Sequence, residues 1–123
     1  MAYPSDLKYT KDHEWVRLTA DMAEVGITDY AQQQLGDVVF VDLPAVGTAV
    51  TAGAPFGNIE SVKAVSELFA PVTAEIVAVN ERLAQAPEEV NTRPHDTWMV
   101  KIRFAGAASD GLLDSVQYET LLT

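Results

Sequence analysis

Cysteine is absent from this 123-residue chain, which excludes disulfide bonds, thiolate catalysis and metal sites built from cysteine. The two histidines are too few for a metal site built from several imidazoles. No apolar run approaches the length of a membrane span, and the N-terminal residues lack the charged-then-apolar pattern of a signal peptide. We therefore expect a cytoplasmic protein, or one of the mitochondrial matrix if a transit peptide has been removed.

Basic residues are also scarce. Eight Lys or Arg stand against 18 Asp or Glu, and the formal net charge is -10. Such a charge repels phosphate backbones and anionic lipid headgroups, so we expect neither nucleic acid nor a membrane as a partner. An acidic surface can steer a protein toward basic pockets on partner proteins, although solubility alone is the commoner explanation of such a charge.

The composition indicates one folded domain that spans residues 1–123. Hydrophobic residues make up 48% of the chain and charged residues 21%, as in ordinary globular proteins. A chain of this length can bury one core but not two independent ones.

Short β-branched stretches separated by turn residues predict a mainly β fold in the first half. "HEWVRLT" (13–19) and "AEVGIT" (23–28) form a predicted first hairpin. "TDYAQQQLG" (28–36) predicts a short helix with Thr28 as its N-cap and Gly36 at its end. "DVVFVDLP" (37–44) is the clearest strand, and its continuous apolar run predicts burial on both faces.

The second half continues the pattern of short strands. "FGNIES" and "VSELFAP" form the arms of a second predicted hairpin, about residues 56–70, with Lys63 at its turn. "AEIVAVN" and "TWMVKIRF" predict two further strands, and "ERLAQAP" one or two helical turns. "SDGLLDSVQYETLL" predicts a C-terminal helix capped by Ser109 or Asp110. Together these elements predict a small sandwich or flattened barrel with short helices.

No complete catalytic motif is present in the sequence. His13 and Glu14 begin an "HExxH" pattern, but its second histidine falls on Arg17. His95 follows a proline in a polar loop, where a solvated or structural role is expected. Trp15 and Trp98 lie in alternating apolar stretches and are expected to anchor the core.

Lys63 is the only Lys or Arg between Arg17 and Arg82. A lysine at an exposed turn is commonly no more than a solvated charge. This lysine, however, is isolated in an acidic interval and lies at a predicted hairpin tip, where an enzyme can reach it. Its primary amine on a flexible stem suits an amide-forming modification.

The stretch around this lysine, "ESVKAVSE" (60–67), resembles the lipoylation hairpin of the H protein of the glycine cleavage system. Other segments resemble the same family in the same order: "YTKDHEWVRL", "VGITDYAQQQLGDVVFVDLP", "VGTAV", "FGNIESVKAVSELFAPV", "VAVN", "WMVKI" and "LLDSVQYETLL". The resemblance implies a lipoyl-domain-like barrel-sandwich hybrid with lipoic acid attached covalently to Lys63. It also implies a non-catalytic carrier subunit, which accords with the missing catalytic motif.

The resemblance further implies four partners. A pyridoxal-phosphate glycine decarboxylase passes an aminomethyl group to the lipoyl arm, a tetrahydrofolate-dependent aminomethyltransferase removes it, and dihydrolipoyl dehydrogenase reoxidises the dithiol. Lipoyl-attaching enzymes load the arm beforehand. The absence of cysteine fits this chemistry, because a nearby thiol could exchange with the disulfide of the arm. A shuttle with an exposed arm is expected to work as a monomer.

Roles for individual residues follow only from the resemblance. Glu60, Ser61, Val62 and Ala64 are expected to shape the hairpin for recognition by a lipoyl-attaching enzyme. Glu14 and Glu67 are expected to bind the ammonium end of the loaded arm, because acids suit a cationic group. The chain departs from the family pattern at Ala74, where the family usually has glycine; this change affects surface geometry and not Lys63.

Other interpretations remain open at this stage. Biotinyl domains usually flank the lysine with methionines and dehydrogenase lipoyl domains place aspartate before it, whereas this chain has Val62 and Ala64. These domains of other complexes are the nearest rival, and an H-like protein that mainly relays lipoyl groups to other enzymes is a subtler one that the sequence does not exclude. A purely structural interaction module is the alternative from a different class, and it would tolerate replacement of Lys63 by arginine.

Overall fold

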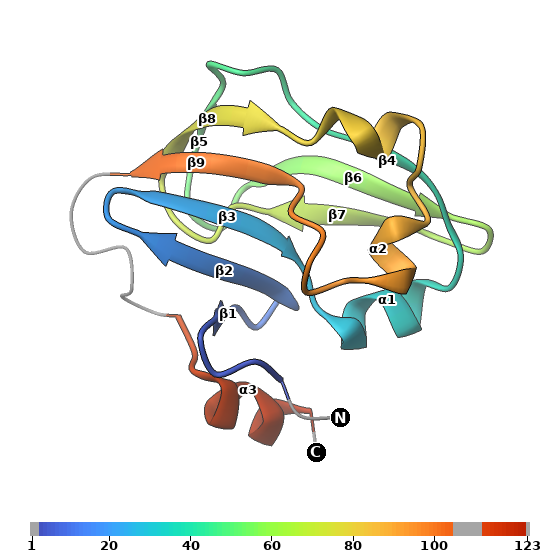
Figure 1. Ribbon diagram of the computed structural model, residues 1–123, viewed down its shortest axis with the longest axis horizontal. Helices are drawn as coiled ribbons and strands as arrows, with labels where there is room; N and C mark the ends of the chain where they lie inside the picture. Colours follow the sequence, from blue (N-terminus) through green and yellow to red (C-terminus); the bar gives the residue numbers. More distant parts are fainter. Residues whose placement is uncertain (1–2, 105–111, 123) are drawn as a thin grey trace.

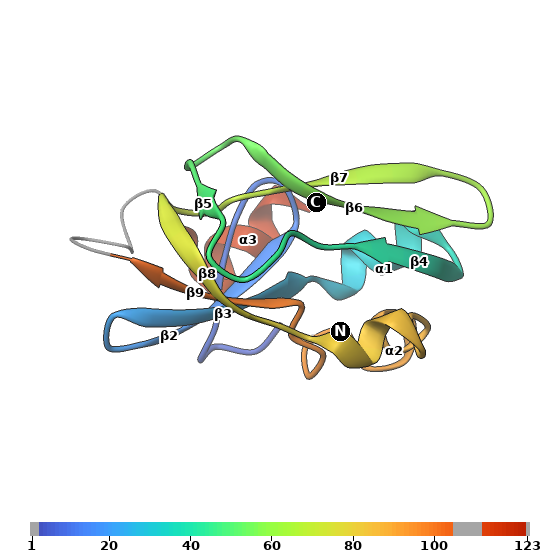
Figure 2. The same cartoon turned by 90° about the horizontal axis from the view of Figure 1, so that it is seen from above.

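The computed structural model describes residues 3–104 and 112–122, and its framework is a pair of facing β-sheets (Figures 1 and 2). The six-stranded sheet has the order β1 (Lys8–Tyr9), β2 (Glu14–Thr19), β3 (Met22–Ile27), β9 (Val100–Phe104), β8 (Ala74–Val79) and β5 (Ala49–Val50). The three-stranded sheet has the order β4 (Val38–Asp42), β6 (Pro55–Ser61) and β7 (Val65–Phe69). All neighbouring strands are antiparallel. The mainly β prediction is confirmed.

The inward faces of the two sheets are apolar. Val25, Ile76 and Ile102 are buried on the six-stranded sheet, and Val41 and Ile59 on the three-stranded sheet. Alternate residues of a strand point to opposite faces, so these side chains meet between the two sheets. The six-stranded sheet is also covered in part on its other face, where Trp15 packs in a separate cluster with Tyr9 and Tyr118. Among the described residues, no helix is long and apolar enough to cross a membrane.

Helix α1 (Asp29–Leu35) begins and ends where the sequence predicts. The Thr28 side chain accepts a hydrogen bond from the Ala31 N–H, which satisfies a free donor in the first turn. Gly36 ends the helix at φ 79°, a conformation that glycine adopts without steric cost. The short 3-10 helix η1 (Glu81–Ala84) confirms the predicted turn, whereas α2 (Glu89–Thr92) has no counterpart in our prediction.

Helix α3 (Ser115–Leu121) confirms a C-terminal helix but not its predicted start. Its N-cap is Asp114, which accepts from the Gln117 N–H while the Gln117 side chain accepts from the Asp114 N–H. This reciprocal capping box satisfies free backbone donors at the first turn and so favours a helix that begins at Ser115. The predicted caps, Ser109 and Asp110, lie outside the described residues.

The prediction that β4 is buried on both faces is wrong. Val38 and Val41 are buried, but Val39 and Phe40 are exposed. The register with β6 shifts between Val38 and Phe40, as expected for a β-bulge at this point. The extra residue breaks the alternation and turns two consecutive apolar side chains outward.

The two tryptophans differ in burial. Trp15 is fully buried and donates its indole N–H to the Pro94 carbonyl over 2.8 Å, as expected of a core anchor. Trp98 is only half-buried, and the Lys101 ammonium lies over its ring. His95 is half-buried rather than solvated, and its Nε2 accepts from the Asp29 N–H, so it has a structural role.

Candidate functional site

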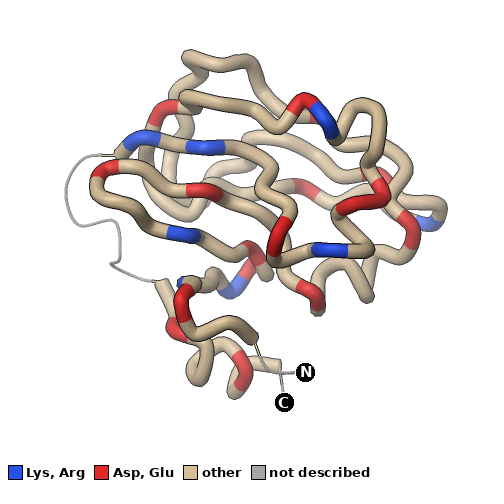
Figure 3. Tube along the Cα trace, in the orientation of Figure 1, with Lys and Arg blue, Asp and Glu red and all other residues tan. Residues whose placement is uncertain are grey.

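Lys63 lies at the tip of the β6–β7 hairpin and its side chain is exposed. The Ser61 N–H donates to the Ala64 carbonyl over 2.8 Å. The Ser61 hydroxyl oxygen accepts from the Lys63 and Ala64 N–H groups. Ser61 thus ties both sides of the turn together, and the tip projects from the body of the molecule, where Figure 3 shows an isolated basic segment.

The foot of this tip is anchored to the chain between α1 and β4. Val62 donates its N–H to the Asp37 carbonyl over 3.0 Å. The stem of Lys63 lies over Gly36, with its Cε 3.4 Å from where a Cβ on Gly36 would stand. The lysine stem thus lies in contact range of the end of α1, and Leu35, next to Gly36, lines the cavity described next.

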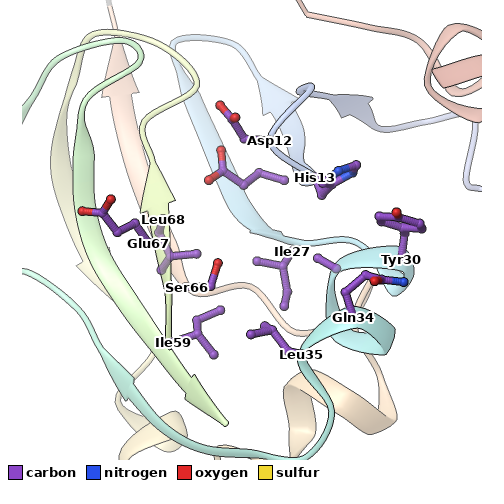
Figure 4. A pocket seen from close by; sticks show the side chains of 12 residues that line it. Asp12, His13, Ile27, Tyr30, Gln34, Leu35, Ile59, Ser66, Glu67 and Leu68 are labelled. Carbon is purple, nitrogen blue, oxygen red and sulfur yellow. The ribbon is translucent and has the colours of Figure 1, made fainter. Parts of the chain in front are cut away.

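A cavity of about 170 Å³ lies between β7, α1 and the loop before β2. Figure 4 shows the apolar side chains of Ile27, Leu35, Ile59 and Leu68 in the middle of its lining. Polar groups surround them, namely His13, Tyr30, Gln34 and Ser66. An apolar lining with a few polar groups suits a flexible apolar arm that ends in a polar group.

Glu14 is a buried acid in the lining of this cavity, with 2% of its surface exposed. Its Oε2 accepts a hydrogen bond of 2.6 Å from the Phe69 N–H, and its Oε1 accepts from the Thr10 hydroxyl over 3.4 Å. Burial raises the pKa of Glu14 to about 8, and the Phe69 N–H only partly offsets this effect. The carboxyl group is therefore mostly protonated at neutral pH.

Two further acids lie at the rim. Glu67 lines the cavity but is exposed, and in Figure 4 its carboxylate points away from Ser66 and Leu68. Asp12 is exposed on the loop before β2 and was not predicted as a site residue. Asp12 lies in the turn before β2, where the alternation of an extended strand does not apply, so no local signal singled it out.

His13 is a second lining residue that the sequence analysis missed. Its backbone has φ 67°, which is uncommon for a residue with a side chain. Its Nδ1 lies 2.8 Å from the Tyr118 hydroxyl, and that hydroxyl also lies 2.7 Å from Thr28 Oγ1. The C-terminal helix thereby supports the cavity rim through contacts that are remote in sequence.

The predicted hairpin residues lie together around Lys63. Glu60, Val62 and Ala64 are exposed, whereas Ser61 is half-buried in the turn that it stabilises. Lys63 and the predicted arm contacts, Glu14 and Glu67, lie on connected elements, since Glu67 belongs to β7 and Glu14 binds the end of β7 through Phe69. The described residues contain no group of acids and histidines that could hold a metal ion.

Two facing sheets with a projecting lysine hairpin define a lipoyl-domain-like barrel-sandwich fold. The solved structure of a glycine cleavage system H protein from Mycobacterium marinum matches it with a TM-score of 0.86 and 38% identity, over 96% of this chain and 97% of that chain. The family model "Glycine cleavage H-protein" matches residues 7–123. This chain belongs to the glycine cleavage H-protein family.

Curated relatives agree over nearly the full length. The glycine cleavage system H protein of Koribacter versatilis is 55% identical, over 97% of this chain and 93% of the relative. That of Acidobacterium capsulatum is 50% identical, over 99% of this chain and 95% of the relative.

Proposed function

We propose that residues 1–123 form a single lipoyl-carrier domain of the glycine cleavage system, with lipoic acid joined by an amide bond to Lys63. The observation that carries this proposal is the placement of one exposed lysine at a hydrogen-bonded hairpin tip, on the hairpin whose strands contribute to the lining of the cavity. Lys63 would hold the lipoyl group, which would supply a disulfide for three partners: it would be reduced as it takes up the aminomethyl group of glycine at the decarboxylase, left as a dithiol by the aminomethyltransferase, and reoxidised by dihydrolipoyl dehydrogenase.

The residues present fit such an arm. The lysine stem already lies against Gly36, next to the cavity residue Leu35. The apolar lining accommodates a hydrocarbon chain and excludes water from it. Lys63 is therefore placed near the end of α1, the helix that contributes Leu35 to the cavity lining.

Glu14 suits the cationic end of a loaded arm. Its carboxyl group is mostly protonated at neutral pH because burial raises its pKa to about 8. An ammonium group placed beside it favours the carboxylate, so the acid ionises when it gains a partner and returns to its neutral form when the partner leaves. Asp12 and Glu67 at the rim add negative potential along the entry path.

The hairpin residues have supporting roles in this proposal. Ser61 and Ala64 fix the turn through their backbone bonds, and Glu60 and Val62 are exposed on either side of it for a lipoyl-attaching enzyme. The chain itself supplies no catalytic group and works as a monomeric, non-catalytic subunit in the cytoplasm. Its acidic surface suits basic pockets on the four partners.

The test is the intact mass of the protein from lipoate-fed cells, measured beside the Lys63→Arg variant. One lipoyl-sized increment is expected on the wild type and none on Lys63→Arg. Lys101→Arg is the matched control, since it removes a lysine that lies on a strand face instead of a hairpin tip. An unmodified wild type, in cells that modify another lipoyl protein, would refute the proposal.

A second measurement separates the shuttle from a lipoyl relay. Reconstituted glycine cleavage with the decarboxylase, the aminomethyltransferase and the dehydrogenase should turn over with wild type and stop with Lys63→Arg. Turnover that survives this substitution would favour a structural interaction module. A lipoylated wild type that supports no turnover would instead favour the relay.

A further inference from the structure

Four exposed apolar side chains, which we call the apolar patch, surround the lysine hairpin. They are Val39, Phe40, Val62 and Val65, with between 49% and 70% of their surface exposed. In the register Phe40 stands opposite Glu60 and Glu60 opposite Val65, so Phe40 and Val65 share the outer face of the three-stranded sheet. Val39 lies at the register shift of β4, and Val62 lies in the turn next to Lys63. Clustered apolar side chains with charged residues among them mark docking surfaces more often than solvated ones.

The patch is built rigidly, although it comes from two segments of the chain. The irregularity in β4 turns Val39 and Phe40 outward. The hydrogen bond from the Val62 N–H to the Asp37 carbonyl ties the hairpin tip to the start of β4. A partner that binds this surface therefore pays little to order it.

The patch and the cavity lie on opposite faces of the same sheet. The neighbouring row of the register joins Val41 to Ile59 and Ile59 to Ser66. Ile59 and Ser66 line the cavity, and consecutive residues of a strand point to opposite faces. A partner can therefore cover the patch and reach Lys63 without entering the cavity.

The charges around the patch are acidic. Asp37, Asp42, Glu60 and Glu67 are exposed on or beside β4, β6 and β7, and Lys63 is the only Lys or Arg in residues 18–81. A second copy of this chain would bring acids against acids, which disfavours self-association. The occupant that fits has an apolar centre with Lys or Arg at its rim.

The position of the patch distinguishes among partners. Amide formation must bring the lysine Nζ itself into the partner's active site, so that enzyme has to contact the residues beside Lys63. Enzymes that act on the far end of the lipoyl arm need to bind only that end, and not the residues beside Lys63. We propose that the apolar patch is the docking surface for the enzyme that attaches the lipoyl group to Lys63; this inference rests on the proposed function.

The attachment step balances with an acyl adenylate as the donor. Nζ bonds to the carbonyl carbon of the lipoyl group, the bond from that carbon to AMP breaks, and the amine loses a proton. The patch takes no part in this chemistry and holds the hairpin so that Nζ reaches the donor. Substitutions in the patch should therefore change the apparent affinity and not the identity of the product.

The test uses purified lipoate–protein ligase with lipoate and ATP, and measures kcat/KM for the unmodified full chain. Phe40→Ser and Val65→Ser should each lower kcat/KM about tenfold, the typical result of removing a central apolar contact. Val116→Ser is the matched control, since Val116 is 72% exposed on α3, away from the hairpin (Figure 1), and should stay within about twofold of wild type. Glu60→Gln should reduce the dependence of kcat/KM on salt, because it removes a rim charge.

The wild type and both patch variants are then fully lipoylated by prolonged incubation, and their reoxidation by dihydrolipoyl dehydrogenase is compared. Equal reoxidation rates are expected. The assignment is overturned if both patch variants are lipoylated like wild type, or if attachment and reoxidation fall together, which would make the patch a general contact. A wild type that the ligase does not modify, while it modifies another lipoyl protein, refutes the proposed function first.

Discussion

The wild type should become less stable as pH rises, because Glu14 is buried. Replacing Glu14 with glutamine should abolish this contribution to the pH dependence of the free energy of unfolding. The pKa of Glu14 is raised from 4.5 to about 8 in the folded chain, with burial as the main cause. Between these values the folded chain keeps a proton that the unfolded chain has released, so folding becomes less favourable as pH increases. The expected slope is about 1.4 kcal/mol per pH unit, and the total over the interval is about 3–5 kcal/mol.

Glutamine keeps a carbonyl oxygen that can accept the hydrogen bond from the Phe69 N–H. The free energies of unfolding of the variant and the wild type should therefore lie within about 1 kcal/mol of each other near pH 5. From pH 5 to pH 9 the variant should gain about 3–5 kcal/mol relative to the wild type. Well below pH 4.5 the side chain of Glu14 is neutral in both the folded and the unfolded wild type. The difference in the free energy of unfolding between wild type and variant should therefore stay constant there.

The assay is urea unfolding of both proteins at several pH values between 4 and 9. Glu67→Gln, at an exposed position on the same cavity rim, is the control and should follow the wild type in parallel. Parallel curves for wild type and Glu14→Gln would refute the reasoning, because they would mean that water or structural adjustment solvates the carboxylate in the folded state.

Two further substitutions test the packing behind the site. Gly26→Ala should destabilise the fold by about 3 kcal/mol or more, since the new Cβ would stand 2.5 Å from the Trp15 ring. That ring is buried and held by its indole hydrogen bond, so it cannot easily move away. An unchanged thermal midpoint would contradict this prediction. Tyr118→Phe should cost about 1–2 kcal/mol in urea unfolding, because the hydroxyl bridges His13 and buried Thr28, while the ring still stacks; full stability would mean that this bridge contributes nothing.

Local signals were sufficient where neighbouring residues decide the conformation. Helix α1 begins at the Thr28 cap and ends at Gly36 as predicted, because capping and a left-handed end depend on residues within one turn. The β6–β7 hairpin is predictable for the same reason: its arms and turn are adjacent, and Ser61 closes the turn over three residues. The position of Lys63 at the tip followed directly.

Local sequence signals were mostly insufficient where the environment of a residue is set by segments that are distant in the sequence. The exposure of Val39 and Phe40 depends on a register shift against β6, which the local apolar run does not reveal. The start of α3 is an exception, because Asp114 and Gln117 form a local capping box that the sequence analysis did not single out. Asp12 and His13 join the cavity only because the loop before β2 lies against α1 and β7.

The sequence by itself thus determined the mainly β framework, the first helix and the presentation of one lysine on an exposed turn, since each depends on periodicity and on contacts within a few residues. Only the tertiary structure decided that Glu14 is buried against Phe69, 55 residues away, and that a cavity and an apolar patch occupy opposite faces of one sheet. Burial and electrostatic environment are properties of the assembled fold, because they depend on which remote segments displace water from each side chain.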